Sequence, residues 1–306
     1  MTILSLGRWR RRRALALHEE AMRLSEQGRN AEAIRRYSKS LELDPARPTT
    51  LFNLALIFKY RNEWERSLEL NLKAHAFAPN DEATRWNAAI AATALGQWTV
   101  ARQMWTEVGI DLPGDDGPIE GDFGQTPVRL DPDGDGEVVW AHRLDPVRAR
   151  IESIPLPESG YHRGDIVLHD GAAVGRRRIA GRELPVFNVL ERLESSEEMT
   201  WTAQVEALDA RAIGRLGVLA DYASVAMEDW TASLQVVCRQ CSESTPHAAH
   251  DKDLAARSWQ NHRRIGLSAK DSAVVESLMV EWASATDSRL VELVCQTAPA
   301  ARSADS

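Results

Sequence analysis

The chain has 306 residues, of which 43% are hydrophobic and 27% are charged, and its formal net charge is −8. This composition is typical of a soluble globular protein with room for two or three domains. A net negative charge argues against general nucleic-acid binding, which needs a concentrated positive field. No apolar run approaches the roughly 20 residues that cross a bilayer, so we expect neither nucleic acid nor a membrane as a partner.

The start of the chain carries a basic segment rather than a targeting signal. Within residues 1–13, Arg8 and Arg10 to Arg13 indicate a solvated helix start or a frayed end, which could also dock on an acidic surface. The short apolar stretch Ile3 to Leu6 precedes these arginines, whereas basic residues come first in a signal peptide. Three cysteines are too few for a disulfide framework, so we expect a cytoplasmic protein.

A period of 34 residues runs through the first third of the chain. It defines the units 14–47, 48–81 and 82–115. Turn-forming residues recur at this spacing: Gly28, Asn62 and Gly96, and Pro45, Pro79 and Pro113. Small residues recur where two helices must touch: Ala21, Ala55 and Ala89, and Ala33, Ser67 and Ala101. Each unit is therefore predicted to be a pair of helices, because small side chains let helices approach and prolines end them.

The pattern resembles the tetratricopeptide repeat (TPR). Residues 14–45, A-L-A-L-H-E-E-A-M-R-L-S-E-Q-G-R-N-A-E-A-I-R-R-Y-S-K-S-L-E-L-D-P, match it at nearly every signature position, and the resemblance covers residues 14–113. The later repeats are looser: Asn62 replaces the turn glycine, and Arg85 and Ala92 occupy sites that usually hold large apolar groups. The resemblance implies an array of α-hairpins that bury their apolar faces by stacking on one another.

The resemblance also implies a binding groove on the concave face, formed by the first helix of each pair. By position, this groove would include His18, Met22, Phe52, Asn53, Leu56, Lys59, Trp86, Asn87 and Ile90. Asn53 and Asn87 match asparagines with which the family often holds a peptide backbone. Of the basic residues that define the carboxylate-clamp subgroup, only Lys59 is present here. Because the groove is apolar and aromatic, we expect a protein or peptide partner that presents an amphipathic helix or a hydrophobic segment.

The end of the array leaves alternatives open. The third repeat runs into Gly114 to Pro118 without the polar capping helix with which such arrays normally end. The last apolar face must then be covered by the following domain or by a second subunit, which would make a homodimer through this end. The chain's own C-terminal half could also fill the groove.

A small β domain is predicted after the array. Residues 114–127 are rich in Gly, Asp and Pro and are expected to form a linker. The periodicity then changes from 3.6 to 2 in four runs: Glu137 to Arg143, Arg148 to Ile154, Asp165 to His169 and Leu184 to Leu193. We therefore expect a small antiparallel β unit, as a sheet or a barrel, over residues 125–195.

Residues 198–297 show the order strand–helix–strand twice. The predicted strands are Thr200 to Leu208, Trp230 to Val237, Arg264 to Leu267 and Leu290 to Cys295. Asp209 is expected to cap the first helix, and Ser268 with Asp271 to form a capping box for the second. This layout predicts a ferredoxin-like α/β sandwich, followed by a disordered tail over residues 298–306. The whole chain is thus predicted to be multidomain, with an α domain before the α+β part.

A candidate zinc loop, residues 238–250, lies between the two halves of this sandwich. Its candidate ligands are Cys238, Cys241, His247 and His250. Two thiolates and two imidazoles are ligands that tetrahedral zinc prefers. We expect a structural ion, because four protein ligands leave no open position for a reacting water. Ordinary strand-end cysteines with loop histidines, or a redox pair, are the alternatives.

The sequence favours a binding function over catalysis. It carries no recognisable phosphate loop or nucleophile motif, so we expect no enzyme. The favoured hypothesis is a cytoplasmic adaptor or scaffold. An immunity or inhibitor protein that masks one toxin or enzyme is an alternative, and an enzyme in the C-terminal half that the repeats supply with substrate is a third.

Overall fold

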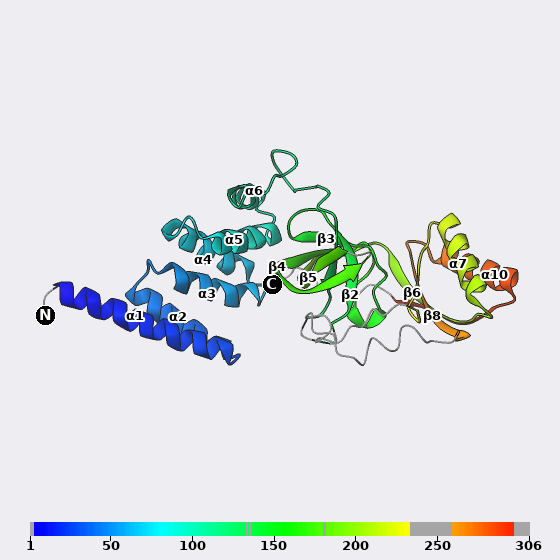
Figure 1. The fold of residues 1–306 in the computed structure, drawn as a ribbon, viewed down its shortest axis with the longest axis horizontal. Helices are drawn as coiled ribbons and strands as arrows, with labels where there is room; N and C mark the ends of the chain where they lie inside the picture. Colours follow the sequence, from blue (N-terminus) through cyan, green and yellow to red (C-terminus); the bar gives the residue numbers. More distant parts are fainter. Residues whose placement is uncertain (1–2, 133, 135, 180–181, 233–258, 297–306) are drawn as a thin grey trace. The chain divides into compact units, whose positions relative to one another are not determined.

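The computed structural model describes residues 3–132, 134, 136–179, 182–232 and 259–296. The chain divides into two compact units, Met1–Gly121 and Asp122–Ser306 (Figure 1). The first unit is helical, and the second carries two β-sheets with helices on one of them.

Within residues 3–121 the chain forms pairs of helices. They are α1 (Ile3–Glu26), α2 (Asn30–Leu43), α3 (Pro48–Lys59), α4 (Trp64–Phe77), α5 (Glu82–Ala94) and α6 (Trp98–Glu107). The pairs follow the period of the sequence, so the predicted helical array is confirmed. Helix α1 begins at Ile3, so that the basic segment is helical from that residue onward and runs into the first repeat without a break. Gly7 to Arg13 are exposed, as in a solvated helix start.

Each helix pair turns at a residue with a left-handed backbone. The φ angle is 74° at Gly28, 56° at Asn62 and 64° at Gly96. Glycine adopts this conformation without steric cost, and asparagine is one of the few other residues that tolerate it. Asn62 therefore preserves the turn geometry, which explains why the looser second repeat still forms its hairpin.

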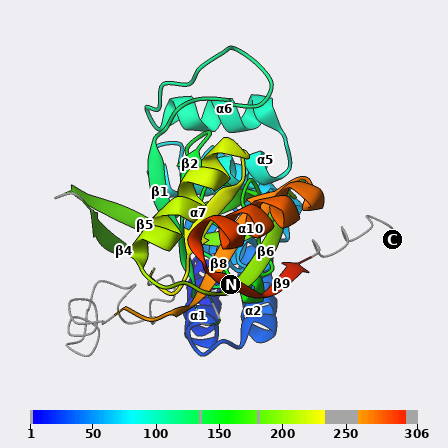
Figure 2. The same ribbon diagram turned by 90° about the vertical axis from the view of Figure 1, so that its right-hand side faces the viewer.

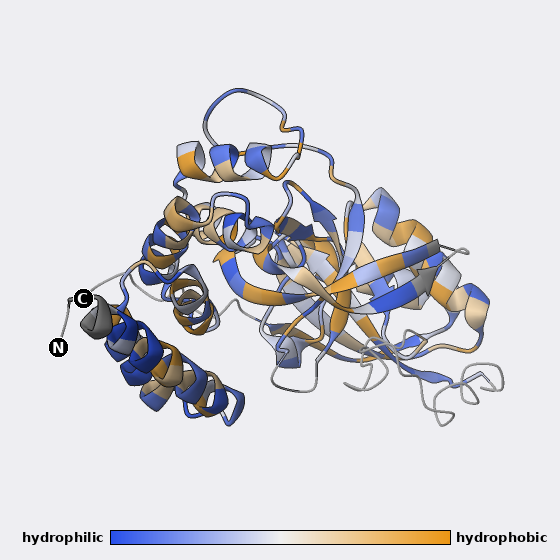
Figure 3. Ribbon diagram, turned by 60° about the vertical axis from the view of Figure 1, so that its left-hand side comes forward, coloured by the Kyte–Doolittle hydropathy of each residue, from blue (hydrophilic) through white to orange (hydrophobic). Residues whose placement is uncertain are grey.

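The small residues of the repeats lie where the helices touch. Ala21, Ala33, Ala55, Ala89 and Ala101 have no exposed surface. In the first two repeats, larger side chains fill the space around them: Leu24, Tyr37, Leu54, Ile57 and Phe58. In Figure 3, hydrophobic residues form orange bands on the otherwise blue, hydrophilic helices α1 and α2. Close helix packing thus follows from the spacing of small side chains.

The loop after α6, which begins the predicted linker, is held against that helix by hydrogen bonds. The guanidinium of Arg102 on α6 donates to the carbonyl oxygens of Pro113 (3.1 Å), Gly114 (2.9 Å), Gly117 (2.9 Å) and Pro118 (3.2 Å). These bonds hold the first part of the predicted linker 114–127 against the last helix. The array therefore ends in an anchored loop. The sequence had suggested only a following domain or a second subunit at this end. The predicted linker ends where β1 begins, at Gln125.

The second unit begins with a closed barrel. Its strands are β1 (Gln125–Arg129), β2 (Val138–Arg143), β3 (Arg148–Ile151), β4 (Ile166–Ile179) and β5 (Arg182–Glu194). Consecutive strands pair antiparallel, whereas β5 closes on β1 in parallel, with Phe187 opposite Val128. An up-and-down barrel with an odd number of strands must close in this way, because its first and last strands run in the same direction. The predicted antiparallel pairing therefore holds between consecutive strands and is wrong at the closing pair.

A four-stranded sheet follows the barrel, in the order β7-β8-β6-β9 with antiparallel neighbours throughout. Its strands are β6 (Met199–Glu206), β7 (Ala226–Asp229), β8 (His262–Ala269) and β9 (Arg289–Gln296). The helices α7 (Ala210–Tyr222) and α10 (Ser272–Thr286) lie side by side over one face of this sheet (Figure 2). The core between them includes Trp201, Val205, Leu216, Ile265, Leu267, Leu278, Met279 and Trp282.

Two details of this sheet correct the sequence predictions. Strand β7 ends at Asp229, so Trp230 lies in the following turn rather than at the start of a strand. Its indole packs over Gly266, where an added Cβ would collide with the ring. Ser268 lies inside β8 and donates to Glu198 (2.7 Å), so it forms no capping box. Asp271 alone caps α10, by accepting a hydrogen bond from the backbone N–H two residues later (2.9 Å).

Candidate functional site

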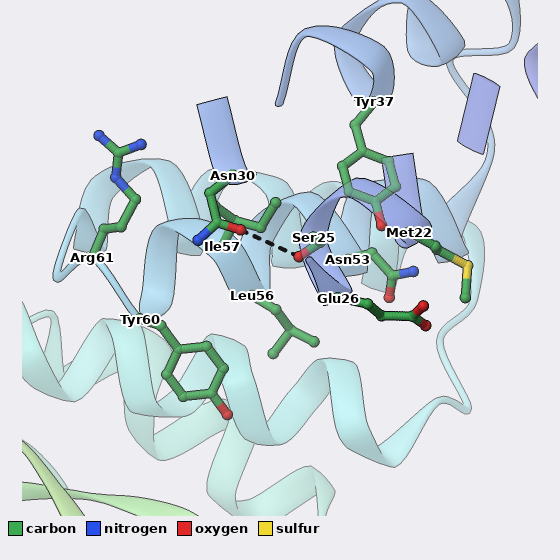
Figure 4. A pocket seen from close by; sticks show the side chains of 10 residues that line it. All are labelled: Met22, Ser25, Glu26, Asn30, Tyr37, Asn53, Leu56, Ile57, Tyr60 and Arg61. Carbon is green, nitrogen blue, oxygen red and sulfur yellow. Dashed lines mark hydrogen bonds between the residues drawn. The ribbon is translucent and has the colours of Figure 1, made fainter. Parts of the chain in front are cut away.

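A pocket of about 400 Å³ opens between the first and second repeats (Figure 4). Its lining residues come from α1, α2, α3 and the turn after α3: Met22, Ser25, Glu26, Asn30, Tyr37, Asn53, Leu56, Ile57, Tyr60 and Arg61. Met22, Asn53 and Leu56 are three of the predicted groove residues, so the structure brings them together. The pocket is the candidate binding site of the array.

The pocket combines an apolar lining with neutral polar groups. Met22, Leu56 and Ile57 supply the apolar surface, and Met22 is 38% exposed. At the polar side, the Ser25 hydroxyl lies 3.4 Å from Asn30 Oδ1, to which it donates (Figure 4). Carboxamides both donate and accept hydrogen bonds, so these polar groups can bind the backbone of a peptide. An apolar side chain of the same peptide can then occupy the pocket.

Tyr37 links the pocket to the core of the first repeats. Burial raises the pKa of its phenol above the usual value, and a side-chain hydrogen bond with Asn53 opposes this shift. The phenol therefore stays neutral at physiological pH. Tyr37 and Asn53 both line the pocket, so the phenol and the carboxamide lie near each other there.

Lys59 and Asn87, two further predicted groove residues, bind each other. Lys59 Nζ donates to Asn87 Oδ1 at 2.9 Å, and Asn87 Nδ2 donates to the carbonyl oxygen of Ala83 at 3.0 Å. Lys59 is only 3% exposed. Its ammonium is thus engaged within the array, where it holds α3 and α5 together.

The remaining predicted groove residues are largely packing residues. His18 is buried, with Nδ1 3.0 Å from the Thr50 hydroxyl, and burial followed by the charge of Arg47 lowers its pKa. Ile90 is also buried. The Trp86 ring meets the Trp105 ring edge-on, with centroids 4.7 Å apart. Phe52 is half-buried and does not line the pocket.

Charged groups are balanced at the rim of the pocket. Arg61 and Glu26 both line it, and Arg61 Nε lies 2.7 Å from Glu63 Oε1. A carboxylate clamp needs cations that can turn to a ligand, whereas Arg61 and Lys59 already have protein partners. The pocket is therefore suited to a neutral or apolar ligand segment.

Sequence reasoning did not assign Glu26, Asn30, Tyr37, Ile57, Tyr60 and Arg61 to the groove, although all of them line the pocket. Tyr60 is the clearest of them, since its aromatic side chain is 61% exposed. It follows Leu56 by four positions and therefore lies on the same side of the helix end. The spacing of Tyr60 from Leu56 could have indicated from the sequence that this aromatic residue borders the groove. The position of Asn30 could not, because it depends on how the turn between α1 and α2 places the second helix.

The predicted zinc ligands Cys238, Cys241, His247 and His250 lie outside the described residues. Within the described part of the chain, no group of three or more His, Cys, Asp or Glu side chains is arranged to hold a metal ion. The zinc site therefore stays a prediction. None of the helices in the same part of the chain is both long and apolar enough to span a membrane.

The comparison with family models agrees with the helical pattern. Residues 23–60 match the family model described as TPR repeat. No curated protein matches the chain by sequence. The first TPR of Spaghetti bound to an HSP90 peptide is 23% identical, with a TM-score of 0.31 over 32% of this chain and 78% of that one. The second TPR of Spaghetti is 17% identical, with a TM-score of 0.33 over 34% and 90%. The Sgt2 TPR domain from Aspergillus fumigatus is 19% identical, with a TM-score of 0.29 over 31% and 63%.

Proposed function

Because the first unit of this chain is a tetratricopeptide-repeat array, we propose that the chain is a cytoplasmic protein-interaction adaptor without catalytic activity. Its ligand is a hydrophobic or helical peptide segment of a partner protein. The pocket between the first two repeats carries this proposal, since it offers an apolar lining beside the carboxamide of Asn53. Aliphatic and aromatic anchors in such pockets usually supply most of the binding energy.

The nature of the ligand follows from the charges of the groove. An acidic C-terminal peptide, such as the HSP90 peptide named for the Spaghetti structures, needs cations for its carboxylates. Here Lys59 donates to Asn87 and Arg61 is paired with Glu63. An acidic tail would compete with these partners for the two cations, whereas an apolar side chain in the pocket would leave the interactions in place.

Site-specific photo-crosslinking in cells tests the proposal. A photoreactive amino acid replaces Tyr60 at the rim of the pocket, and in a control chain it replaces Lys73, an exposed residue of α4. We expect a discrete partner to be crosslinked at position 60 and not at position 73. Equal yields at both positions would contradict a specific groove. A single toxin or enzyme as the captured protein would favour the inhibitor alternative.

The partner segment that is crosslinked is then synthesised as a peptide, and its affinity for the full chain and for its variants is measured. Asn53→Ala and Leu56→Ala should each weaken binding about tenfold, which corresponds to about 1.4 kcal/mol, and Lys73→Ala should leave it unchanged. The peptide SRMEEVD should bind more weakly than the captured segment. Tight binding of SRMEEVD that depends on its carboxylates would overturn the assignment of an apolar ligand.

We also propose that residues 198–297 adopt a ferredoxin-like topology. The support is the strand order β7-β8-β6-β9, in which β8 separates the two strands of the first strand–helix–strand unit. Many unrelated functions occur on such sandwiches, so no activity follows from this topology.

A structural zinc ion on Cys238, Cys241, His247 and His250 is a further proposal, and it rests on the sequence alone. Purified full-length protein should carry about one zinc ion per chain, and acidification should weaken binding because protons compete for thiolate and imidazole. Replacing Cys238 and Cys241 by Ser should remove the metal. Cys295→Ser, which alters a cysteine of β9, is the matched control and should retain it. Elemental analysis of protein purified from zinc-replete cells measures the zinc content. Protein without metal would refute the site.

A further inference from the structure

The pocket between the first two repeats carries one charge of each sign, and the two charges differ in their partners. Arg61 Nε lies 2.7 Å from Glu63 Oε1, so this cation is already engaged. Glu26 is exposed, and within the described part of the chain its carboxylate takes part in no ion pair. In Figure 4 Glu26 lies toward Met22 and Asn53, whereas Arg61 lies at the opposite end of the pocket. The α1 end of the pocket therefore offers a carboxylate to a ligand.

Glu26 continues a row of exposed side chains along α1. Leu15, Glu19, Met22 and Glu26 follow one another at intervals of four, three and four residues, so they lie on one side of the helix. Leu15 is 39% exposed, Met22 is 38% exposed, and both glutamates are exposed as well. We call these four residues the α1 stripe. Apolar and acidic side chains alternate along it, and its last two members line the pocket.

The arginines of α1 leave the two carboxylates of the stripe available. Arg23 is exposed beside the stripe, yet it does not line the pocket, and no ion pair among the described residues joins it to Glu19 or Glu26. The basic segment ends at Arg13, six residues before Glu19, which is about 9 Å along the helix. Exposed charges at this distance are largely screened at physiological salt, where the Debye length is about 8 Å. The stripe is therefore acidic where it reaches the pocket.

We propose, on the basis of the function proposed above, that the ligand is a basic amphipathic helix of a partner protein, with a Lys or Arg side chain that pairs with Glu26 beside its apolar anchor. The anchor contacts Met22 and Leu56 in the pocket. Basic residues three or four positions from the anchor face Glu26 and Glu19. This spacing fits the α1 stripe, because one side of a helix returns every three to four residues.

Peptide selection on the immobilised full-length protein tests this inference. The probe is a display library of random peptides of about 16 residues, which allows about four helical turns. The same selection is made on Glu26→Lys and on Glu65→Lys, the matched charge reversal at an exposed residue of α4 outside the pocket. The wild type and Glu65→Lys should enrich Lys or Arg three or four positions from an apolar residue. Glu26→Lys should enrich Asp or Glu there instead.

A peptide enriched on the wild type then gives the size of the effect. Its Kd should rise about five- to tenfold in Glu26→Lys, because repulsion replaces the attraction of an exposed ion pair. The Kd should stay unchanged in Glu65→Lys. At about 0.5 M salt the difference between the wild type and Glu26→Lys should largely disappear, since salt screens exposed charges.

The outcomes separate this inference from the proposed function. Peptides that lose binding in Leu56→Ala, yet bind equally to the wild type and Glu26→Lys, would refute the basic ligand and leave the pocket as the binding site. Failure to select any peptide whose binding depends on Leu56 would refute both. Self-association of the full chain that Glu26→Lys abolishes, measured by ultracentrifugation, would place the basic segment of a second copy in the pocket and overturn the assignment to a separate partner.

Discussion

At the scale of single residues, the groove is shaped by side chains that bind one another. The Lys59 ammonium is buried, and a hydrogen bond to the Asn87 carboxamide compensates part of the cost of removing it from water. The same carboxamide donates to the Ala83 carbonyl oxygen one turn earlier. Asn87 therefore contributes to the stability of the array.

Asn87→Ala should destabilise the array by about 1–3 kcal/mol, because it removes an acceptor from a buried ammonium. Urea unfolding followed by helical circular dichroism measures this change. Asn80→Ala, at an exposed asparagine just before α5, is the control and should change stability by less than about 0.5 kcal/mol. Equal effects of the two variants would show that the Lys59–Asn87 bond contributes nothing measurable.

His169 makes the barrel sensitive to acid. It is fully buried, stacks on Phe187 with ring centroids 4.8 Å apart, and its Nδ1 lies 2.9 Å from the Asp170 carbonyl oxygen. Burial lowers its pKa from 6.5 to about 4. The stability that this histidine contributes is complete above pH 6.5 and is lost as the pH falls through about 4.

His169→Gln should therefore reduce the acid sensitivity of the second unit. Between pH 7.5 and 4, the free energy of unfolding of the wild type should fall by about 2–3 kcal/mol more than that of the variant. Chemical denaturation at several pH values measures the difference. His142→Gln in β2 of the same barrel, whose side chain is 31% exposed, serves as the control and should follow the wild type.

At the scale of elements, α6 and the loop that follows it behave as one structure. The planar guanidinium of Arg102 satisfies backbone carbonyl groups that would otherwise need water, and it does so from a buried position. The loop is thus part of the array rather than a free linker.

Arg102→Ala should release this loop and lower the stability of the array by about 2 kcal/mol, since several hydrogen bonds to a charged group are lost. Hydrogen exchange of residues 113–118 should increase locally. Gln103→Ala changes the exposed neighbour on α6 and should leave both quantities unchanged. Unaltered exchange of residues 113–118 in Arg102→Ala would mean that the loop is held by other contacts.

At the scale of the whole molecule, the division into Met1–Gly121 and Asp122–Ser306 predicts where the chain can be truncated to a stable fragment. A fragment of residues 1–121 keeps the anchored loop, whereas a fragment of residues 1–113 loses it and exposes the apolar face of the last helix. The longer fragment should be monomeric and melt several degrees higher, and the shorter one should self-associate. Ultracentrifugation and thermal melts compare them. Identical behaviour would show that the loop does not cover this face.

The sequence by itself determined the features that depend on near neighbours. The 34-residue period set the helix pairs, and Gly28, Asn62 and Gly96 marked turns that all proved left-handed. Alternation of apolar residues indicated most strands of the barrel and of the second sheet. These features are readable because helix periodicity, strand alternation and turn conformation each depend on a few consecutive residues.

Tertiary structure alone decided what distant residues do together. The carbonyl groups that Arg102 binds, the position of Trp230 over Gly266, and the approach of Asn30 to the pocket all join parts of the chain that no local pattern connects. Lys59 was predicted to face the groove, and the structure shows that its ammonium is buried and donates to Asn87. Local patterns assign a residue to a helix or strand and to one face of it. Its hydrogen-bond partner depends on how the helices and strands pack. That partner decides whether a charged group or an amide remains available to a ligand.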